Sequence, residues 1–464
     1  MKVRSENKNR IVNLAKVTRP TASKILLRKR LFECLKYRVN SPVLWVTGPA
    51  GSGKTALVSS YIESQNIPCL WYKVDSKDTD LETFYFNLRL AGKKTFPKMN
   101  NMPALLTDYP CDMQDFNHDF FSTLFNNIAK PSVLVLDNYQ EIPEEIMLHD
   151  LLLEAFNMLP EGIRIIIISR KEPLAKFSRL RVNRRMNLIG WQDIRFNSRE
   201  FQNVINNWGF EDIPEEIFVE IYQKLDGWIA GLLFILEGTN RYNTNIQHVG
   251  IGSLEDIFSY FSEEVYEYLD NEVKHFLLTT SLLPYITGRL AHELCGVSQA
   301  ARSLSCIARH NLFIEELAVS EIDTFQYVPI FREFLMSKLE ETFAPGKLNK
   351  MKRKAASLLL AENQIEEAAG LLRRAEDWDG LLNIINQHAP ILISQQKTKF
   401  LLVLLNSIPP VIASLNPLLP YWFGVCQQQT NPAEAQISFR HAFKISCEQQ
   451  DHSGSFAAWT GLVR

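Results

Sequence analysis

The residues from Gly48 to Thr55, Gly-Pro-Ala-Gly-Ser-Gly-Lys-Thr, are the group in this chain whose types and spacing best suit chemistry. They match the phosphate-loop pattern GxxxxGK[ST] without a mismatch. Glycines allow a tight loop whose backbone N–H groups point inward and bind phosphate oxygens. In such a loop Lys54 reaches the β- and γ-phosphates of ATP, and the Thr55 hydroxyl holds Mg²⁺. The predicted nucleotide contacts are Gly48, Pro49, Ala50, Gly51, Ser52, Gly53, Lys54, Thr55 and Ala56.

Two further polar residues follow apolar runs. Asp137 ends the run Ser-Val-Leu-Val-Leu-Asp and is predicted to bind Mg²⁺ together with Thr55, although an ordinary aspartate at a turn would look the same. Arg170 follows a second run and can reach the γ-phosphate and report its presence, whereas a surface ion pair is the simpler alternative. Lys54, Asp137 and Arg170 are therefore the candidate catalytic residues.

The residue after Asp137 bears on the rate of hydrolysis. Many NTPases place a carboxylate there to orient or deprotonate the attacking water. This chain has Asn138, whose amide cannot accept that proton, and Glu141 lies nearby in sequence without a geometric reason to replace it. The sequence predicts tight nucleotide binding with slow hydrolysis, which suits a switch better than a motor.

The elements that must position these residues are strands alternating with helices. The strand-like runs are mostly continuous and apolar, as in a parallel sheet buried on both faces. We expect an α/β domain with a parallel sheet. The expected strands are Pro42–Thr47, Cys69–Val74, Ser132–Leu136 and Arg164–Ser169, and the first helices are Thr55–Ser64 and Leu81–Ala91.

Composition excludes some classes of protein. The 464 residues, 46% of them hydrophobic, suggest three or four globular domains. A formal net charge of -2 argues against the whole chain being an electrostatic nucleic-acid binder. The polar N-terminus does not fit a signal peptide, no apolar run is long enough to cross a membrane, and seven scattered cysteines do not suggest a disulfide framework. We expect a cytoplasmic protein that does not contact membranes.

Several segments in order resemble the MalT-type branch of the STAND (signal transduction ATPase with numerous domains) ATPases. Besides the phosphate loop and the two apolar runs, they are Lys16–Pro20, Trp71–Asp75, Asp226–Leu232 and Phe325–Phe334. The resemblance implies a P-loop NTPase domain, a helical domain, a winged-helix domain and α-helical TPR-like (tetratricopeptide) repeats. The expected boundaries are an N-terminal tail at 1–15 and domains at 16–196, 197–250, 251–345 and 346–464.

The resemblance also implies a mechanism. ADP would hold a closed resting form, and an unknown inducer at the C-terminal repeats would permit exchange for ATP. The ATP form would then self-associate and activate an effector, often a DNA-binding domain. Val17, Thr18, Arg19 and Pro20 would enclose the adenine. One position departs from the family pattern, because Val328 replaces a histidine that can contact the ADP β-phosphate, and valine cannot donate that hydrogen bond.

The rest of the chain is mainly helical in pattern. Ser198 is predicted to cap a helix, and the polar stretch Thr239–Gly252 is predicted to be a linker. Two short runs, Leu312–Ile314 and Phe325–Val328, could form the hairpin wing of a winged helix. Further helices are expected at Ala355–Glu362, Ile365–Arg374 and Trp378–Gln387.

A Trp-x-Gly pair at Trp422 and Gly424 returns at Trp459 and Gly461, which resembles stacked repeats. Because the sequence stops at Arg464 within the second such unit, we expect further repeats and an effector domain beyond it, and DNA binding only through that missing effector.

The leading hypothesis is a regulatory ATPase switch that controls transcription. Three alternatives stay open: a P-loop ATPase or kinase with rapid turnover, a scaffold with permanently bound ADP, and a STAND protein that acts in defence against phage. Asn138 and the long helical region count against the first alternative, and Val328 counts against the second without excluding it.

Overall fold

The structure is a computed structural model. It describes residues 16–21, 26–38, 41–97, 99, 102–103, 112–210, 213–242, 251–317, 323–395, 397–413, 416–428 and 431–463, so the predicted tail at 1–15 lies outside it. The chain forms two compact units. The first comprises the described parts of Met1–Leu269, Arg302–Leu317 and Tyr327–Phe331, and the second those of Asp270–Ala301, Ala318–Gln326 and Arg332–Arg464.

A parallel five-stranded sheet organises the first unit. Its strands are β1 (Val43–Thr47), β2 (Cys69–Lys73), β3 (Ser132–Asp137), β4 (Ile163–Ser169) and β5 (Met186–Ile189), in the order β2-β3-β4-β1-β5. All four predicted strands are confirmed within a residue at each end. The fifth, β5, was missed because four residues that include Asn187 give too short an apolar run. Register pairs Thr47 with Ser169 and Lys73 with Asp137, so the carboxyl ends of these strands share one edge.

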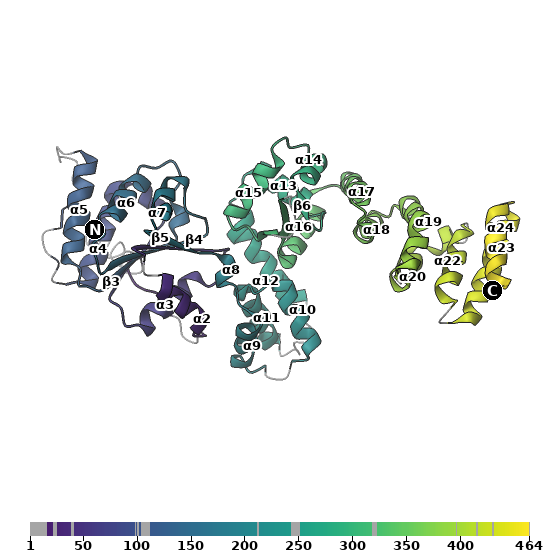
Figure 1. The fold of residues 1–464 in the computed structure, drawn as a ribbon, viewed down its shortest axis with the longest axis horizontal. Helices are drawn as coiled ribbons and strands as arrows, with labels where there is room; N and C mark the ends of the chain where they lie inside the picture. The colour runs from purple at the N-terminus through teal and green to yellow at the C-terminus, as the bar shows by residue number, and fades with distance from the viewer. Residues whose placement is uncertain are drawn as a thin grey trace, which may run out of the picture. The chain divides into compact units, whose positions relative to one another are not determined.

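Both faces of this sheet are buried, which explains the continuous apolar runs. On one face, Val43 and Trp45 pack with aromatic residues such as Phe120. Their neighbours Leu44 and Val46 point to the opposite face and are also buried. Figure 1 shows α2 and α3 on one side of the sheet and α5 and α6 on the other. The helices of this region are α2 (Lys29–Arg38), α3 (Lys54–Ser64), α4 (Leu81–Thr95), α5 (Met113–Asn127), α6 (Leu148–Asn157), α7 (Ser178–Val182) and α8 (Trp191–Ile194), with short 3₁₀ turns η1 (Ser76–Thr79), η2 (Tyr139–Glu141) and η3 (Ala175–Phe177).

Four helices and a π-helical turn complete the main part of the first unit. They are α9 (Ser198–Asn207), α10 (Glu215–Leu225), α11 (Ile229–Tyr242), α12 (Ile251–Phe261) and η5 (Ser262–Tyr266).

Two predictions in this region were wrong in detail. The N-cap of α9 is Asn197, whose side chain accepts from the Glu200 N–H, and Ser198 is the first helical residue. The predicted linker Thr239–Gly252 is helical at both ends, because α11 continues to Tyr242 and α12 begins at Ile251. Thr239 is accommodated in α11 because its hydroxyl donates to the Ile235 carbonyl at 2.7 Å. The middle of the predicted linker, residues 243–250, lies outside the described part of the chain.

Short strands and helices follow η5. They are α13 (Asn271–Thr280), β6 (Ile286–Thr287), α14 (Gly288–Cys295), α15 (Ala300–Arg309), β7 (Ile314–Leu317), β8 (Thr324–Tyr327) and α16 (Pro329–Thr342). In the second unit β6 pairs antiparallel with β8, where Ile286 lies opposite Phe325. Strands β7 and β8 overlap the two runs that were predicted to form a wing.

The rest of the second unit is helical over its described residues. Its first three helices overlap the three that were predicted between Ala355 and Gln387. Its helices are α17 (Pro345–Ala361), α18 (Ile365–Arg374), α19 (Trp378–Ser394), α20 (Thr398–Ser407), α21 (Pro410–Ala413), α22 (Leu418–Gln427), α23 (Pro432–Glu448) and α24 (His452–Val463). No helix among the described residues is long and apolar enough to cross a membrane.

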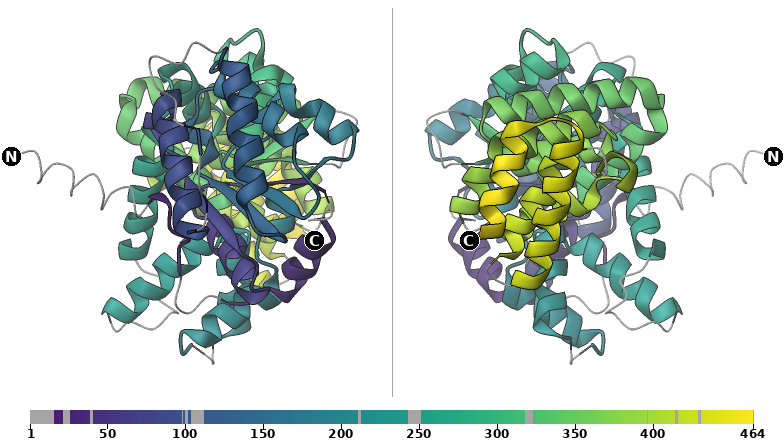
Figure 2. Two further views of the ribbon diagram at one scale, coloured as in Figure 1. Left: turned by 90° about the vertical axis from the view of Figure 1, so that its left-hand side faces the viewer. Right: turned by 90° about the vertical axis from the view of Figure 1, so that its right-hand side faces the viewer.

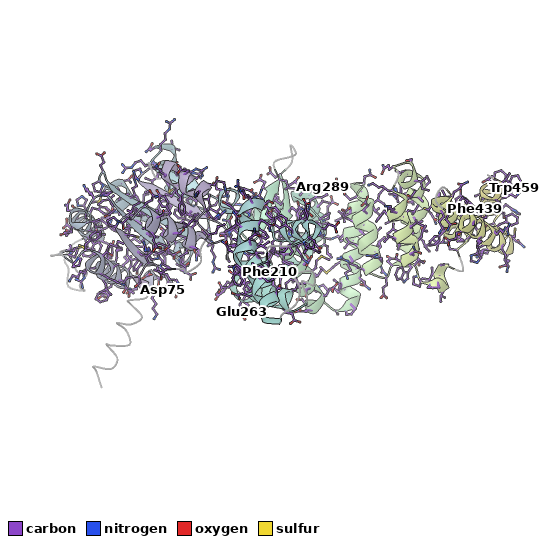
Figure 3. All side chains as sticks on the ribbon, turned by 90° about the horizontal axis from the view of Figure 1, so that it is seen from below. Asp75, Phe210, Glu263, Arg289, Phe439 and Trp459 are labelled. Carbon is purple, nitrogen blue, oxygen red and sulfur yellow. The ribbon has the colours of Figure 1, made fainter. Side chains whose placement is uncertain are left out.

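The glycines of the two Trp-x-Gly pairs have a packing role. A Cβ at Gly424 in α22, or at Gly461 in α24, would lie 2.6 Å from the ring of Phe439 in α23. The ring therefore occupies the space that both glycines leave, and α23 and α24 lie side by side (Figure 2). Phe439 is buried, whereas Trp459 is half exposed at the outer side of these helices (Figure 3). That these helices are TPR-like repeats stays a prediction.

Candidate functional site

The predicted phosphate loop joins β1 to α3. Gly51 and Gly53 have φ angles of 68° and 82°, in the left-handed region that glycine adopts without steric cost. Gly53 is the N-cap of α3, and Lys54, Thr55 and Ala56 form its first turn. The amides of a first helical turn have no carbonyl partner in their own helix, so they are free to bind an anion.

Lys54 is held inside the loop. Its ammonium donates to the carbonyls of Gly48 and Pro49 at 2.8 and 2.7 Å and to the Ser52 hydroxyl at 3.2 Å. Burial, and then the positive charge of Arg170, lower the pKa of Lys54 from 10.5 to about 7. A negative ligand in the loop would oppose both effects and raise this pKa, because its charge would stabilise the ammonium.

Thr55 and Asp137 meet, although they come from α3 and β3. The Thr55 hydroxyl donates to the two Asp137 carboxylate oxygens at 3.0 and 3.3 Å. Asp137 is buried, and this burial raises its pKa even though Thr55 and the Asn138 N–H donate to it. A buried carboxylate beside a hydroxyl is the kind of oxygen donor set that Mg²⁺ binds, and a cation there would stabilise the ionised acid. These two residues fit the metal role predicted for them.

Arg170 lies directly after β4, on the same edge of the sheet. Its guanidinium donates to the Glu264 carbonyl at 2.8 Å and to the Glu264 carboxylate at 2.7 Å. Its backbone N–H donates to the Gln140 side chain at 3.0 Å, which ties the end of β4 to the turn after β3. The sequence predicted Arg170 at this edge, but it did not predict Glu264 in η5 as its partner, because 94 residues separate the pair.

Residues 16–20, predicted to enclose the adenine, contact η1, α4 and α3. Val17 is buried in the core of the sheet domain. Lys16 pairs with Asp78 and Asp75 at 2.8 and 2.9 Å, which fixes the start of this segment. The other contacts are Thr18 with Lys94, Arg19 with Glu63, and Pro20 with Ser59. Since Ser59 and Glu63 belong to the helix that begins at the phosphate loop, the segment runs beside that helix.

A segment before β7 contacts the same edge of the sheet. Asn311, with a φ of 50°, donates from its side-chain amide to the Thr47 hydroxyl at 3.0 Å and to the Arg170 carbonyl at 2.9 Å. Val328, where the family pattern has histidine, is buried, and its N–H donates to the Phe313 carbonyl at 2.8 Å. Asn311 was not predicted, and no sequence pattern marks it.

The parallel sheet, the glycine-rich loop after β1 and the acid at the end of β3 together define the P-loop NTPase fold class. The model of the MalT winged helix domain matches residues 262–346, and the model of the nephrocystin 3 N-terminal region matches residues 21–170.

The chain is similar in sequence to HTH-type transcriptional regulators named MalT. The Vibrio cholerae protein is 24% identical over 439 residues, which are 91% of this chain and 48% of the relative. The protein of Klebsiella pneumoniae strain 342 is 26% identical over 427 residues, which are 89% of this chain and 47% of the relative. The chain thus spans about half the length of these curated relatives. Among solved structures, a Walker-type ATPase of Pyrococcus abyssi has a TM-score of 0.49 and 16% identity, covering 66% of this chain and 93% of its own.

Proposed function

We propose that this chain is the ATP- and ADP-binding regulatory switch of a MalT-like transcription regulator. The observation that carries the proposal is the contact of Thr55 with Asp137, which joins the phosphate loop to a buried acid from another strand. Lys54 lies in the same loop and supplies the positive charge. ATP or ADP would bind with its phosphates on residues 48–56, and bound Mg²⁺ would neutralise phosphate charge at Thr55 and Asp137.

The surroundings of this site favour a slow switch over rapid turnover. Asn138 follows the acid and cannot accept a proton from water. Glu141, the other nearby candidate for a base, is exposed in the turn η2. We therefore propose that hydrolysis is slow and resets the switch, with Lys54, Asp137 and Arg170 as the participating residues.

Arg170 is the proposed sensor of the γ-phosphate. It is bound to Glu264, so a γ-phosphate would have to compete with that carboxylate for the guanidinium. ADP, which lacks the γ-phosphate, would leave the pair intact. We propose that this difference separates the resting form from the active form. An inducer at the C-terminal helices would favour exchange, followed by self-association and effector activation.

The test is calorimetric titration of the purified chain with ADP and with ATP in the presence of Mg²⁺. We expect saturable binding of both nucleotides, and at least a hundredfold loss in a Lys54→Ala variant. A Lys73→Ala variant is the matched control, because it removes an exposed lysine near Asp137 outside the loop. No binding by the folded wild-type chain would overturn the proposal.

A further inference from the structure

The phosphate loop is contacted by Trp228, the residue before α11, and by Ala230 in the first turn of α11. The indole N–H of Trp228 donates to the Ala50 carbonyl at 2.8 Å. The backbone N–H of Ala230 donates to the Gly51 carbonyl at 3.2 Å. These two bonds act on consecutive peptide units of the loop, although 178 residues separate Trp228 from Ala50.

Trp228 is rigidly placed. Its side chain is fully buried. The ring stacks on Phe261 with centroids 4.9 Å apart and meets the edge of Phe313 at 5.3 Å. The loop also packs closely against α11, since a Cβ at Gly51 would lie 2.6 Å from the Ala230 side chain. The direction of the indole N–H is therefore set by packing and not by the loop.

Peptide geometry links these two contacts to phosphate binding. In a planar trans peptide, the carbonyl and the N–H of one unit point in opposite directions. The Ala50 carbonyl shares its peptide with the Gly51 N–H, and the Gly51 carbonyl shares its peptide with the Ser52 N–H. Donors that hold both carbonyls on the side of Trp228 and Ala230 consequently turn both N–H groups to the opposite side. The Ser52 N–H there donates to the Pro49 carbonyl at 3.3 Å, the same carbonyl that accepts from Lys54, so a bound phosphate oxygen would replace this long bond. Gly51, with a φ of 68°, has the backbone freedom to rotate these peptides if the donors are lost.

We infer that Trp228, together with the backbone amide of Ala230, is a positioning group that aims the Gly51 and Ser52 N–H groups at the phosphates of the bound nucleotide. This inference rests on the proposed nucleotide binding and adds a residue to which no role was assigned. Its consequence is that the affinity for phosphate depends on the contact of α11 with the loop. A movement of α11 away from the loop would release the two carbonyls and weaken phosphate binding without altering Lys54.

The test compares ADP with adenosine, which carries no phosphate. Trp228→Phe keeps a ring against Phe261 and Phe313 but removes the indole donor together with part of the buried ring volume, and the control below removes the same volume. We expect about fivefold weaker ADP binding, the factor of one ordinary hydrogen bond, and unchanged adenosine binding. Trp71→Phe is the matched control. Trp71 is also buried, but its indole nitrogen has no hydrogen-bond partner among the described residues, so ADP binding should stay at the wild-type value.

A second variant, Ala230→Val, tests the inference independently, so that the test does not depend on whether Trp228→Phe folds. Ala230→Val places a larger, partly exposed side chain against Gly51 and should produce the same loss for ADP with none for adenosine. Equal ADP affinity in wild type and in folded Trp228→Phe would overturn the inference and leave the proposed function standing. Equal losses for ADP and adenosine would also overturn it, since they would indicate a purely structural role. Absence of ADP binding in the wild type would instead refute the proposed function.

Discussion

Lys54 should take up a proton when ADP binds. In the free protein its pKa is lowered to about 7, with burial as the main cause and Arg170 as the second. Phosphate in the loop would stabilise the ammonium and raise this pKa again. At pH 8 the free protein is then mostly neutral at Lys54, whereas the complex is protonated. We expect an uptake close to one proton per ADP at this pH.

The same linkage predicts the pH dependence of affinity. Between the lowered pKa and the ordinary value of 10.5, the complex binds more protons than the free protein, so affinity must fall as pH rises. If the pKa in the complex lies well above 9, ADP binding weakens by about 50-fold between pH 7 and pH 9. The ADP phosphate itself ionises near or below pH 7, so measurements at pH 8 and above isolate the contribution of Lys54.

The assay is calorimetric titration with ADP at pH 8 in buffers of different ionisation enthalpy, which gives the proton uptake directly. Lys54→Arg should abolish the uptake at ligand concentrations that saturate the variant, because guanidinium stays charged throughout this range. Lys73→Arg, an exposed lysine outside the loop, should leave it unchanged. An uptake near zero in the wild type, with affinity flat from pH 7 to pH 9, would refute the reasoning about Lys54.

Three further variants address the residues around the loop. Glu264→Gln removes the carboxylate that competes with the γ-phosphate for Arg170, so it should raise the ATP-to-ADP affinity ratio about two- to fivefold, as expected for a partly exposed ion pair. The same change at the exposed neighbour Glu263 (Figure 3) should leave the ratio unchanged. An unchanged ratio in Glu264→Gln would count against the sensor role of Arg170. Asp137→Asn should abolish the Mg²⁺ dependence of ATP binding. It should also keep or raise the melting temperature at pH 7, because burial raises the pKa of this acid, so its ionised form lowers the stability of the folded protein above the unfolded pKa. A lower melting temperature would contradict this. Asn311→Ala loses two hydrogen bonds at a positive φ and should destabilise the first unit by about 1–3 kcal/mol in a denaturant melt. Asn311→Gly should be destabilised less, because glycine adopts a positive φ without strain. Equal stability of Asn311→Ala and wild type would show that these hydrogen bonds do not contribute to stability.

The parts of the site that depend on local pattern could be predicted from the sequence. Four strands were found because continuous apolar runs between turns are typical of strands buried on both faces. The shared edge of a parallel sheet then places the phosphate loop, Asp137 and Arg170 together without knowledge of any contact. The Thr55–Asp137 hydrogen bond is the expected result of that arrangement.

Contacts across long stretches of sequence could not be predicted in the same way. Asn311 meets Thr47 over a separation of 264 residues, and the residues around Asn311 show no periodicity that would mark it. Glu264 lies in a π-helical turn among other acidic residues, and only tertiary packing selects it as the partner of Arg170. The cap of α9 was misplaced by one residue because Asn197 and Ser198 are both favourable N-cap residues, and the side-chain geometry decides between them.

The measurement that tests the nucleotide switch most directly is the nucleotide content and assembly state of the purified protein. The chain would be denatured, any released nucleotide identified, and the particle size compared by light scattering with ADP and with ATP and Mg²⁺. The proposal predicts bound ADP, with larger assemblies only in ATP and none in a Lys54→Ala variant. A protein that contains no nucleotide, binds none when ADP or ATP is added, and keeps one size under all conditions would contradict it.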